Sequence, residues 1–349
     1  MNGGGFMFYR ECWYVAAWPK EVVSVPLRRI IMNEPVVMFR CADGSLAALE
    51  DRCSHRNFPL SKGVVNGDSL QCGYHGLTFD RKGICIYAPG QERPALGSKI
   101  HIQAYPIEER HGIAWIWMGE SGNADRSLIP DLSWLRAPGW TPFTGGYIHL
   151  KAPDQYLVEN LLDVSHLAYV HKTSLGSDPD QTAGGKITVT VEPFGVRRVT
   201  TSEDVPTPPI YGRSALVGTK IDQRIESTMR PGLYQNLHVL KNSGSGDWSS
   251  DGADGDYPIR TRSFHGIVPE RDGSTHYFFG GAFMDIDVPA MDGEQARTIL
   301  TEDVNVLEAI AVNAELIGGR PTVNLRNDVA VMRWRSYRKG ILKSIRARP

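Results

Sequence analysis

The stretch that decides the fold runs from Cys53 to Gly76 and reads CSHRNFPLSKGVVNGDSLQCGYHG. It holds a Cys-x-His pair and, after sixteen residues, a Cys-x-x-His pair. Cysteine and histidine side chains grouped in two short loops are typical of a metal site. The candidate ligands are Cys53, His55, Cys72 and His75.

Two kinds of metal centre suit this pattern. A single tetrahedral zinc ion could hold the two loops together, although zinc sites commonly group like ligands, as in Cys-x-x-Cys. One thiolate and one imidazole from each loop better suit a two-iron cluster, in which one iron takes both thiolates and the other takes both imidazoles. Neutral imidazoles raise the reduction potential to about −150 to +300 mV, so such a centre can pass single electrons to an oxidising partner.

Length and composition exclude several classes of protein. The chain has 349 residues and a net charge of −1, so it can hold two domains but has no basic field for nucleic acid or an anionic membrane. It contains neither an apolar run of membrane-spanning length nor the basic and apolar regions of a signal peptide. Five cysteines make no disulfide framework, so we expect a cytoplasmic protein with no nucleic-acid or membrane partner. The remaining three cysteines, which we expect to be small buried apolar residues, are Cys12, Cys41 and Cys85.

The hydrophobic pattern predicts an α+β protein with an N-terminal all-β domain and a C-terminal domain of antiparallel sheet and helices. Short alternating segments around glycine turns predict the β domain over residues 1–120, with the four candidate ligands at loop tips. A polar, proline-rich segment predicts a linker over residues 121–144, and residues 145–349 form the second domain. The expected hairpin turns are Asp43-Gly44, Lys82-Gly83 and His111-Gly112.

Three helices are expected in the second domain. The first covers residues 154–171, the second runs from Met291 to Gly319, and the last runs from about Asn324 to Lys339. The Gly-, Ser- and Asp-rich residues 242–256 predict a mobile surface loop.

The first of these helical segments contains Asp163, His166 and His171. Histidines on an amphipathic helix more often have a structural role, in which they form hydrogen bonds, than a role as metal ligands. Residues five apart on an ideal helix diverge by about 140°, so binding of one metal ion by both requires a break or a π-bulge between them. However, an electron-passing cluster needs an acceptor, and nothing else in the chain offers one.

The motif CSHR…LSKG…CGYHG resembles the cluster motif of the Rieske non-heme iron oxygenases, position by position. The resemblance implies a [2Fe-2S] cluster in which Cys53 and Cys72 hold one iron while His55 and His75 hold the other. That family usually has proline where this chain has Gly73. We expect this change to make the loop more flexible without removing a ligand.

The pattern Asp-x-x-His-x-x-x-x-His is similar to the mononuclear Fe(II) site of the same family. The resemblance implies that His166 and His171 are two arms of a 2-His-1-carboxylate triad with open positions for O₂. By resemblance to the C-terminal helix of the family, the third arm is Asp303, with Glu302 as the alternative. A solvated acidic helix face is the competing interpretation.

Three further residues are candidates for the site. Asp163 lies on nearly the same helix face as His166 and could accept its second ring N–H. In the family this aspartate also reaches His75 of a neighbouring subunit, which implies a homotrimer with electrons crossing between chains. Asn160 is either a pocket residue or a surface amide. His265 is either a pocket residue that binds the acid group of the substrate or a hydrogen-bonded core histidine.

No dinucleotide-binding fingerprint is present, so electrons must come from another protein. The resemblance implies an NAD(P)H-dependent reductase, in some members acting through a ferredoxin. A basic run over residues 333–348 is usually a solvated face, but it could be a docking patch for an acidic redox partner.

The resemblance covers nearly the whole chain and is nearest to the vanillate O-demethylase, dicamba monooxygenase and toluenesulfonate methyl-monooxygenase group. It implies a terminal oxygenase component that hydroxylates or O-demethylates a methyl- or methoxy-substituted aromatic acid with O₂. Two alternatives remain, namely cis-dihydroxylation of an aromatic ring and a non-catalytic Rieske electron carrier.

Overall fold

The computed structural model describes residues 8–91, 100–176, 185–211, 214, 216, 218–245, 248, 257–284, 293–318 and 320–346. The chain forms two compact units, of which the first comprises Met1–Asp131 with Val268–Asp272 and the second comprises Leu132–Ile267 with Gly273–Pro349. Residues 121–144 contain 3-10 turns and the beginning of a long strand. The domain boundaries at residues 120 and 144 therefore remain a prediction.

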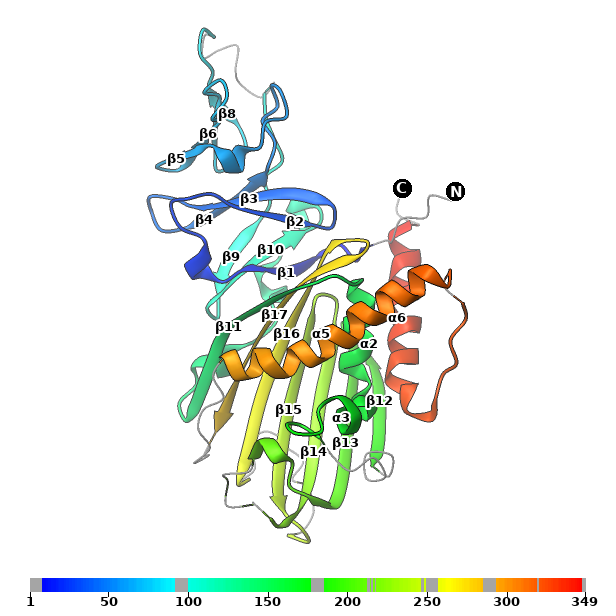
Figure 1. The fold of residues 1–349 in the computed structure, drawn as a ribbon. Helices are drawn as coiled ribbons and strands as arrows, with labels where there is room; N and C mark the ends of the chain where they lie inside the picture. Colours follow the sequence, from blue (N-terminus) through cyan, green and yellow to red (C-terminus); the bar gives the residue numbers. More distant parts are fainter. Residues whose placement is uncertain are drawn as a thin grey trace. The chain divides into compact units, whose positions relative to one another are not determined.

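The first unit consists of three antiparallel sheets with the strand orders β1-β10-β9, β2-β3-β4 and β5-β6-β7-β8 (Figure 1). The hairpins expected at the three glycine turns are present, between β3 and β4, between β7 and β8, and between β9 and β10. The strands are β1 Cys12–Ala17, β2 Leu27–Ile31, β3 Glu34–Arg40, β4 Leu46–Glu50, β5 Val64–Asn66, β6 Ser69–Gln71, β7 Thr78–Asp80, β8 Cys85–Tyr87, β9 Ile107–Arg110 and β10 Ile113–Met118.

Buried apolar side chains from β3, β4, β6 and β7 form the core beneath the two Cys/His loops. This core includes Phe39, Leu49 and Phe79, each fully buried, and it surrounds Cys53 and Cys72. The loops therefore lie on a rigid sheet base, which is the arrangement that holds ligand side chains in place.

The second unit is built on one seven-stranded sheet with the order β11-β17-β16-β15-β14-β13-β12. Its helices lie against one face of the sheet, and α5 crosses the strands (Figure 1). The α+β fold class expected from the sequence is confirmed. The elements are β11 Trp140–Leu150, α2 Asp154–Leu162, α3 Leu167–Val170, β12 Lys186–Glu192, β13 Gly195–Pro206, β14 Lys220–Arg230, β15 Leu233–Asn242, β16 Ile259–Arg271, β17 Ser274–Met284, α5 Gly293–Leu316 and α6 Val329–Arg346.

The long helix α5 was predicted within a few residues of its ends. Its buried stripe contains Ala296, Asp303, Val304 and Leu307, which lie at helical spacing on one face. The prediction for the last helix is wrong at both ends, because α6 begins at Val329 and continues past Gly340. Packing of α6 against β12 and β13 outweighs the cost of about 1 kcal/mol for an internal glycine.

The mobile loop expected over residues 242–256 lies mostly outside the described residues. Among the described helices, none is both long enough and apolar enough to cross a membrane.

Candidate active site

The two Cys/His loops adopt the same backbone turn. In the first loop the N–H of Cys53 donates to the carbonyl of Phe58 (2.9 Å), and its own carbonyl accepts from the N–H four residues later (2.9 Å). In the second loop the N–H of Cys72 donates to the carbonyl of Leu77 (2.7 Å), and its carbonyl again accepts from the N–H four residues later (3.1 Å). The repeated turn places the two cysteines in matching positions, with a histidine two residues later in the first loop and three residues later in the second.

The four side chains of these loops converge. The thiols of Cys53 and Cys72 are buried and in contact with each other, and burial is the main cause that raises the pKa of the Cys53 thiol. The imidazoles of His55 and His75 are exposed, with ring centroids 4.7 Å apart. Two sulfur ligands on the inside and two imidazoles on the outside fit the ligand set of a Rieske [2Fe-2S] cluster.

Gly73 lies close to a neighbouring chain segment. A Cβ atom at this position would lie 2.8 Å from the carbonyl oxygen of Lys62, which is too close for a real contact. At Gly63, a Cβ atom would lie 2.1 Å from the carbonyl oxygen of Gln71. The sequence suggested only a more flexible loop at Gly73, whereas the structure adds a steric reason for glycine.

The other three cysteines have no role in these loops. Cys41 and Cys85 are buried and Cys12 is partly exposed, and none of the three forms a disulfide. Burial is the largest cause of the raised pKa of each thiol, so all three remain protonated near neutral pH.

The segment that carries the two histidines of the second unit is not one continuous helix. Helix α2 ends at Leu162, a 3-10 turn covers Val164–His166, and the single α-helical turn α3 follows. His171 lies just past α3 with φ −107° and ψ 36°, outside the helical region. This interrupted helical path turns both imidazoles toward one point, as a shared metal ion requires.

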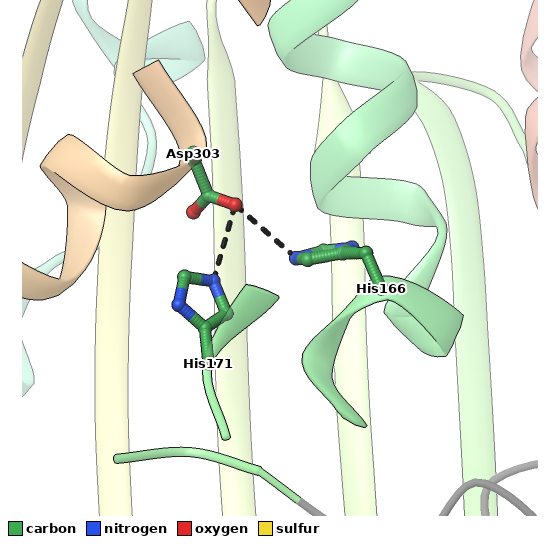
Figure 2. A group of neighbouring side chains, drawn as sticks. All are labelled: His166, His171 and Asp303. Carbon is green, nitrogen blue, oxygen red and sulfur yellow. Dashed lines mark hydrogen bonds and ion pairs between the residues drawn. The ribbon is translucent and has the colours of Figure 1, made fainter. Parts of the chain in front are cut away.

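His166, His171 and Asp303 meet at that point (Figure 2). The Nε2 atom of His166 lies 3.3 Å from Oδ1 of Asp303, and the Nε2 atom of His171 lies 3.1 Å from the same oxygen. Neighbouring ligands of an octahedral ion at about 2.1–2.2 Å are about 3.0 Å apart, so the distances from Asp303 to both imidazoles suit neighbouring ligands of one ion. His171 and Asp303 are 1% and 3% exposed, so the site is largely closed to bulk water.

The structure distinguishes the two acidic candidates on α5. Asp303 points between the two imidazoles, whereas Oε2 of Glu302 lies 2.7 Å from Nδ1 of His171, on the opposite side of that ring. Glu302 therefore holds the orientation of His171. Sequence reasoning missed this role. The available signal was that the two carboxylates are adjacent on one helix, since adjacent helical residues point about 100° apart and therefore face different directions.

Asn160 and Asp163 also lie beside the triad. The Nδ2 atom of Asn160 donates to Oδ1 of Asp303 (3.2 Å), and its Oδ1 is buried without a partner among the described residues. The carboxylate of Asp163 accepts from the N–H of Ser165 (2.9 Å) and so caps the 3-10 turn. Nδ1 of His166 bonds to the backbone carbonyl of Asp163, so the expected contact with its carboxylate is replaced by one with its main chain.

The charges of the triad are mutually dependent. Burial alone would raise the pKa of Asp303, but hydrogen bonds from His166 and His171 outweigh it and hold that pKa below its usual value. Burial alone would lower the pKa of His171, but its bonds to Asp303 and Glu302 raise it instead. A carboxylate that stays ionised while buried is the state in which it can bind a cation.

The triad forms part of the wall of a cavity of about 230 Å³. Most of the cavity lining is apolar, and its apolar side chains include Leu161, Val164, Leu167, Ile225, Phe279 and Leu300. A mostly apolar cavity with a few placed polar groups suits a small aromatic molecule.

His265 lies in the cavity wall and is 9% exposed. Its Nδ1 lies 2.6 Å from the Tyr277 hydroxyl, and its Nε2 lies 3.2 Å from the hydroxyl of Ser263. Burial lowers the pKa of His265 to about 4, so the ring is neutral near neutral pH. A neutral imidazole has one donor and one acceptor nitrogen, so His265 is a hydrogen-bonding group of the cavity wall without a charge.

The basic run at the end of the chain is partly used inside the molecule. Arg335 forms a bidentate ion pair with Glu159, in which its Nε and Nη2 atoms lie 2.7 Å and 2.6 Å from the two carboxylate oxygens. This ion pair joins α6 to α2. The Arg335 guanidinium is therefore not a freely available charge for docking.

A β unit with two Cys/His loops, and a sheet unit whose His-His-Asp triad opens onto an apolar cavity, are the features of a Rieske-type oxygenase. Two family models match the chain, the Rieske [2Fe-2S] domain over residues 12–106 and the vanillate O-demethylase oxygenase C-terminal domain over residues 150–344. The match to a Rieske domain replaces the zinc interpretation.

Proteins with known roles are similar over nearly their whole length. The iron-sulfur subunit of the toluene-4-sulfonate monooxygenase system of Comamonas testosteroni is 33% identical, over 97% of this chain and 98% of that protein. The oxygenase component of dicamba O-demethylase from Stenotrophomonas maltophilia is 33% identical, over 93% of this chain and 95% of that protein. The crystal structure of dicamba monooxygenase with 3,6-dichlorosalicylic acid matches with a TM-score of 0.86 and 30% identity, covering 98% of this chain and 100% of that one.

The chain therefore belongs to the vanillate O-demethylase group of Rieske oxygenases, and it is an oxidoreductase of the oxygenase-component type. The relatives are named as subunits or components of larger systems, which is consistent with electron supply by a separate protein.

Proposed function

We propose that this chain is the terminal oxygenase that hydroxylates or O-demethylates a methyl- or methoxy-substituted aromatic acid. The observation that carries the proposal is the convergence of His166, His171 and Asp303 on the wall of an apolar cavity. The relatives include enzymes named for vanillate, dicamba and toluenesulfonate, all of which are aromatic acids.

The residues present fit two iron centres. Cys53, Cys72, His55 and His75 would hold a [2Fe-2S] cluster, and His166, His171 and Asp303 would hold one Fe(II), as the solved dicamba monooxygenase with non-heme iron suggests. When bound, these groups supply stepwise electron transfer and O₂ activation. For a methoxy substrate, Ar–O–CH₃, O₂, two electrons and two protons give Ar–O–CH₂OH and water, and the hemiacetal then releases formaldehyde and the phenol.

The protein's own side chains bind the substrate and exclude water. His265, Ser263 and Asn236 line one part of the cavity, and their polar side chains are suited to hydrogen-bond the acid group. Asn160 is bonded to Asp303, and its carbonyl oxygen beside the triad has no partner among the described residues. Substrate that fills the apolar cavity would displace water from the oxygen-binding side, which limits wasted reduction of O₂.

Asp163 has two proposed roles. Its carboxylate caps the turn that carries His166, and in a homotrimer it would lie on the electron path to that histidine from the cluster of a neighbouring subunit. Electrons would reach the cluster from an NAD(P)H-dependent reductase, directly or through a ferredoxin. The exposed edges of His55 and His75 are suitable contacts for such transfers.

The test uses the full chain loaded with iron and sulfide, a surrogate reductase, and a panel of methyl- and methoxy-substituted aromatic acids. We expect three irons per chain, formaldehyde with the matching phenol from at least one methoxy acid, and a trimer by light scattering. Asp303→Asn should abolish product while leaving the visible absorption of the cluster intact.

Other outcomes identify the alternatives. Two irons per chain with no product from any acid would indicate an electron carrier and refute the proposal. A cis-dihydrodiol as the main product would indicate a ring-dihydroxylating enzyme instead.

A further inference from the structure

We propose that Arg198 is a positioning residue of the iron site, which stabilises the helix break that brings His166 and His171 together. Arg198 lies on β13 and acts through the backbone carbonyl of Leu162, 36 positions earlier in the chain. The inference rests on the proposed function, because it names a further residue on which the iron site of that function depends.

The helix break leaves one backbone carbonyl without its usual partner. In an uninterrupted α-helix, the carbonyl of Leu162 would accept from the N–H of His166, four residues later. Here α2 ends at Leu162, and Asp163 has an extended backbone with φ −104° and ψ 104°. Leu162 is 1% exposed, and an unpaired carbonyl is costly in a buried place. The carbonyl therefore needs a partner from elsewhere in the chain.

Arg198 supplies that partner. Its Nη1 atom donates to the carbonyl oxygen of Leu162 at 2.7 Å, and Arg198 itself is 2% exposed. The carbonyl lies at the C-terminal end of α2, where the helix dipole is negative and favours a cation. On β13, Arg198 lies opposite Val189 of β12 and Ser227 of β14, so the backbone that carries the guanidinium is fixed on both sides.

The next peptide unit connects this bond to the metal-binding nitrogen. The carbonyl of Asp163, which directly follows Leu162, bonds to Nδ1 of His166. A carbonyl oxygen only accepts, so Nδ1 carries the hydrogen and the free lone pair is on Nε2. That Nε2 atom lies 3.3 Å from Oδ1 of Asp303, where His171 also arrives (Figure 2). Without the bond to Arg198, the backbone that orients His166 loses its anchor on the sheet.

The rest of the guanidinium is poorly bonded. Its Nε and Nη2 atoms are buried without a hydrogen-bond partner in the described part of the chain, and so is the hydroxyl of Ser227 opposite. Burial of a charge with most of its hydrogen bonds unmade lowers stability. Stability alone therefore does not explain an arginine at this position, whereas the bond to the end of α2 does.

The experiment measures Co(II) binding, by titration without O₂, to the full chain with its cluster loaded and its iron site empty. Co(II) is the probe because its EPR spectrum reports ligand geometry while the oxidised cluster is EPR-silent. Arg198→Met, which removes every donor, should bind Co(II) at least about 10-fold more weakly and with a changed spectrum. Arg198→Lys, which keeps a cationic donor, should restore the wild-type spectrum and most of the affinity.

Arg197→Met is the matched control. Arg197 precedes Arg198 on β13, faces the other side of the sheet, and pairs with Glu226 (2.5 Å). This variant should bind Co(II) as the wild type does. Cluster absorption and melting temperature report the folding of each variant. If Arg198→Met does not fold, Arg198→Gln takes its place, because a glutamine amide ends two bonds short of the Nη1 position.

Wild-type Co(II) affinity and spectrum in Arg198→Met or Arg198→Gln would overturn the positioning role. Equal weakening in Arg198→Lys and Arg198→Met would also overturn it, because the donor would then not matter. A wild-type protein that binds no Co(II) would refute both this role and the proposed function. Product formation is measured separately, so the expected Co(II) results without product from any acid would refute the proposed function and leave the role of Arg198 standing.

Discussion

At the scale of single residues, Glu302 is the group whose role the structure changes most. It holds Nδ1 of His171 while Asp303 faces Nε2. Because an outer hydrogen-bond partner orients a ligand histidine, Glu302→Ala should lower iron affinity by about 10- to 100-fold. Glu302→Gln keeps an accepting oxygen and should have a smaller effect. Iron per chain after dialysis against a chelator measures this.

The matched control is Glu315→Ala, an exposed position of the same helix α5. Unchanged iron retention in Glu302→Ala would show that the bond to His171 does not support the metal site.

Gly73 gives a second prediction at this scale. The Cβ of Gly73→Ala would approach the Lys62 carbonyl to 2.8 Å, so one of the two backbone segments must move. We expect a loss of about 1–3 kcal/mol of unfolding free energy, as for other overpacked sites, and a shifted reduction potential of the cluster. Gly122→Ala is the control, since no atom lies within 4 Å of its Cβ position. Equal melting temperatures for the two variants would contradict the steric explanation.

At the scale of elements, Asp163 connects the end of α2 to the turn before α3. Asp163→Ala removes both cap and charge, and loss of the cap should cost about 1 kcal/mol. Asp163→Asn keeps a capping oxygen but removes the charge. If the carboxylate serves electron transfer, the asparagine variant should keep wild-type stability and iron content yet lose most reductase-driven turnover. Wild-type turnover in Asp163→Asn would limit this residue to its capping role.

At the scale of the whole molecule, His238 makes stability depend on pH. Its pKa is about 4 in the folded chain and about 6.5 in the unfolded chain, so between these values the unfolded state binds more protons. Folding stability should therefore fall as pH falls from about 6.5 to about 4. Because His238 opens partly onto the cavity, we expect about 1–2 kcal/mol of loss between pH 7 and pH 5.

Denaturant unfolding of wild type and His238→Gln at the two pH values measures this loss. The variant should lose less stability than wild type, while His101→Gln, an exposed position, should match wild type. Identical pH slopes in wild type and His238→Gln would show that His238 is not buried in its neutral form.

The parts of the molecule that sequence could predict are those with short-range signals. Glycine turns gave the hairpins of the β unit, and helical spacing gave α5, because each depends on neighbouring residues. The bounds of α6 depend on packing against β12 and β13, which lie far away in the chain. The role of Glu302 depends on a contact with His171, 131 residues away, and the hydrogen bond between Tyr211 and His238 joins residues 27 positions apart. A local sequence pattern does not indicate contacts of this kind.

The regular spacing of polar groups along β15 and β16 also works as a molecular ruler. Their backbones are fixed by pairing with neighbouring strands, so exchanging one side chain changes what the wall recognises without moving the others. Residues on one face of a strand recur at intervals of about 6.6 Å, so each exchange changes the cavity wall at one known position. The polar pattern of this wall can thus be altered one position at a time, apart from the proposed iron-binding residues, which lie on other elements.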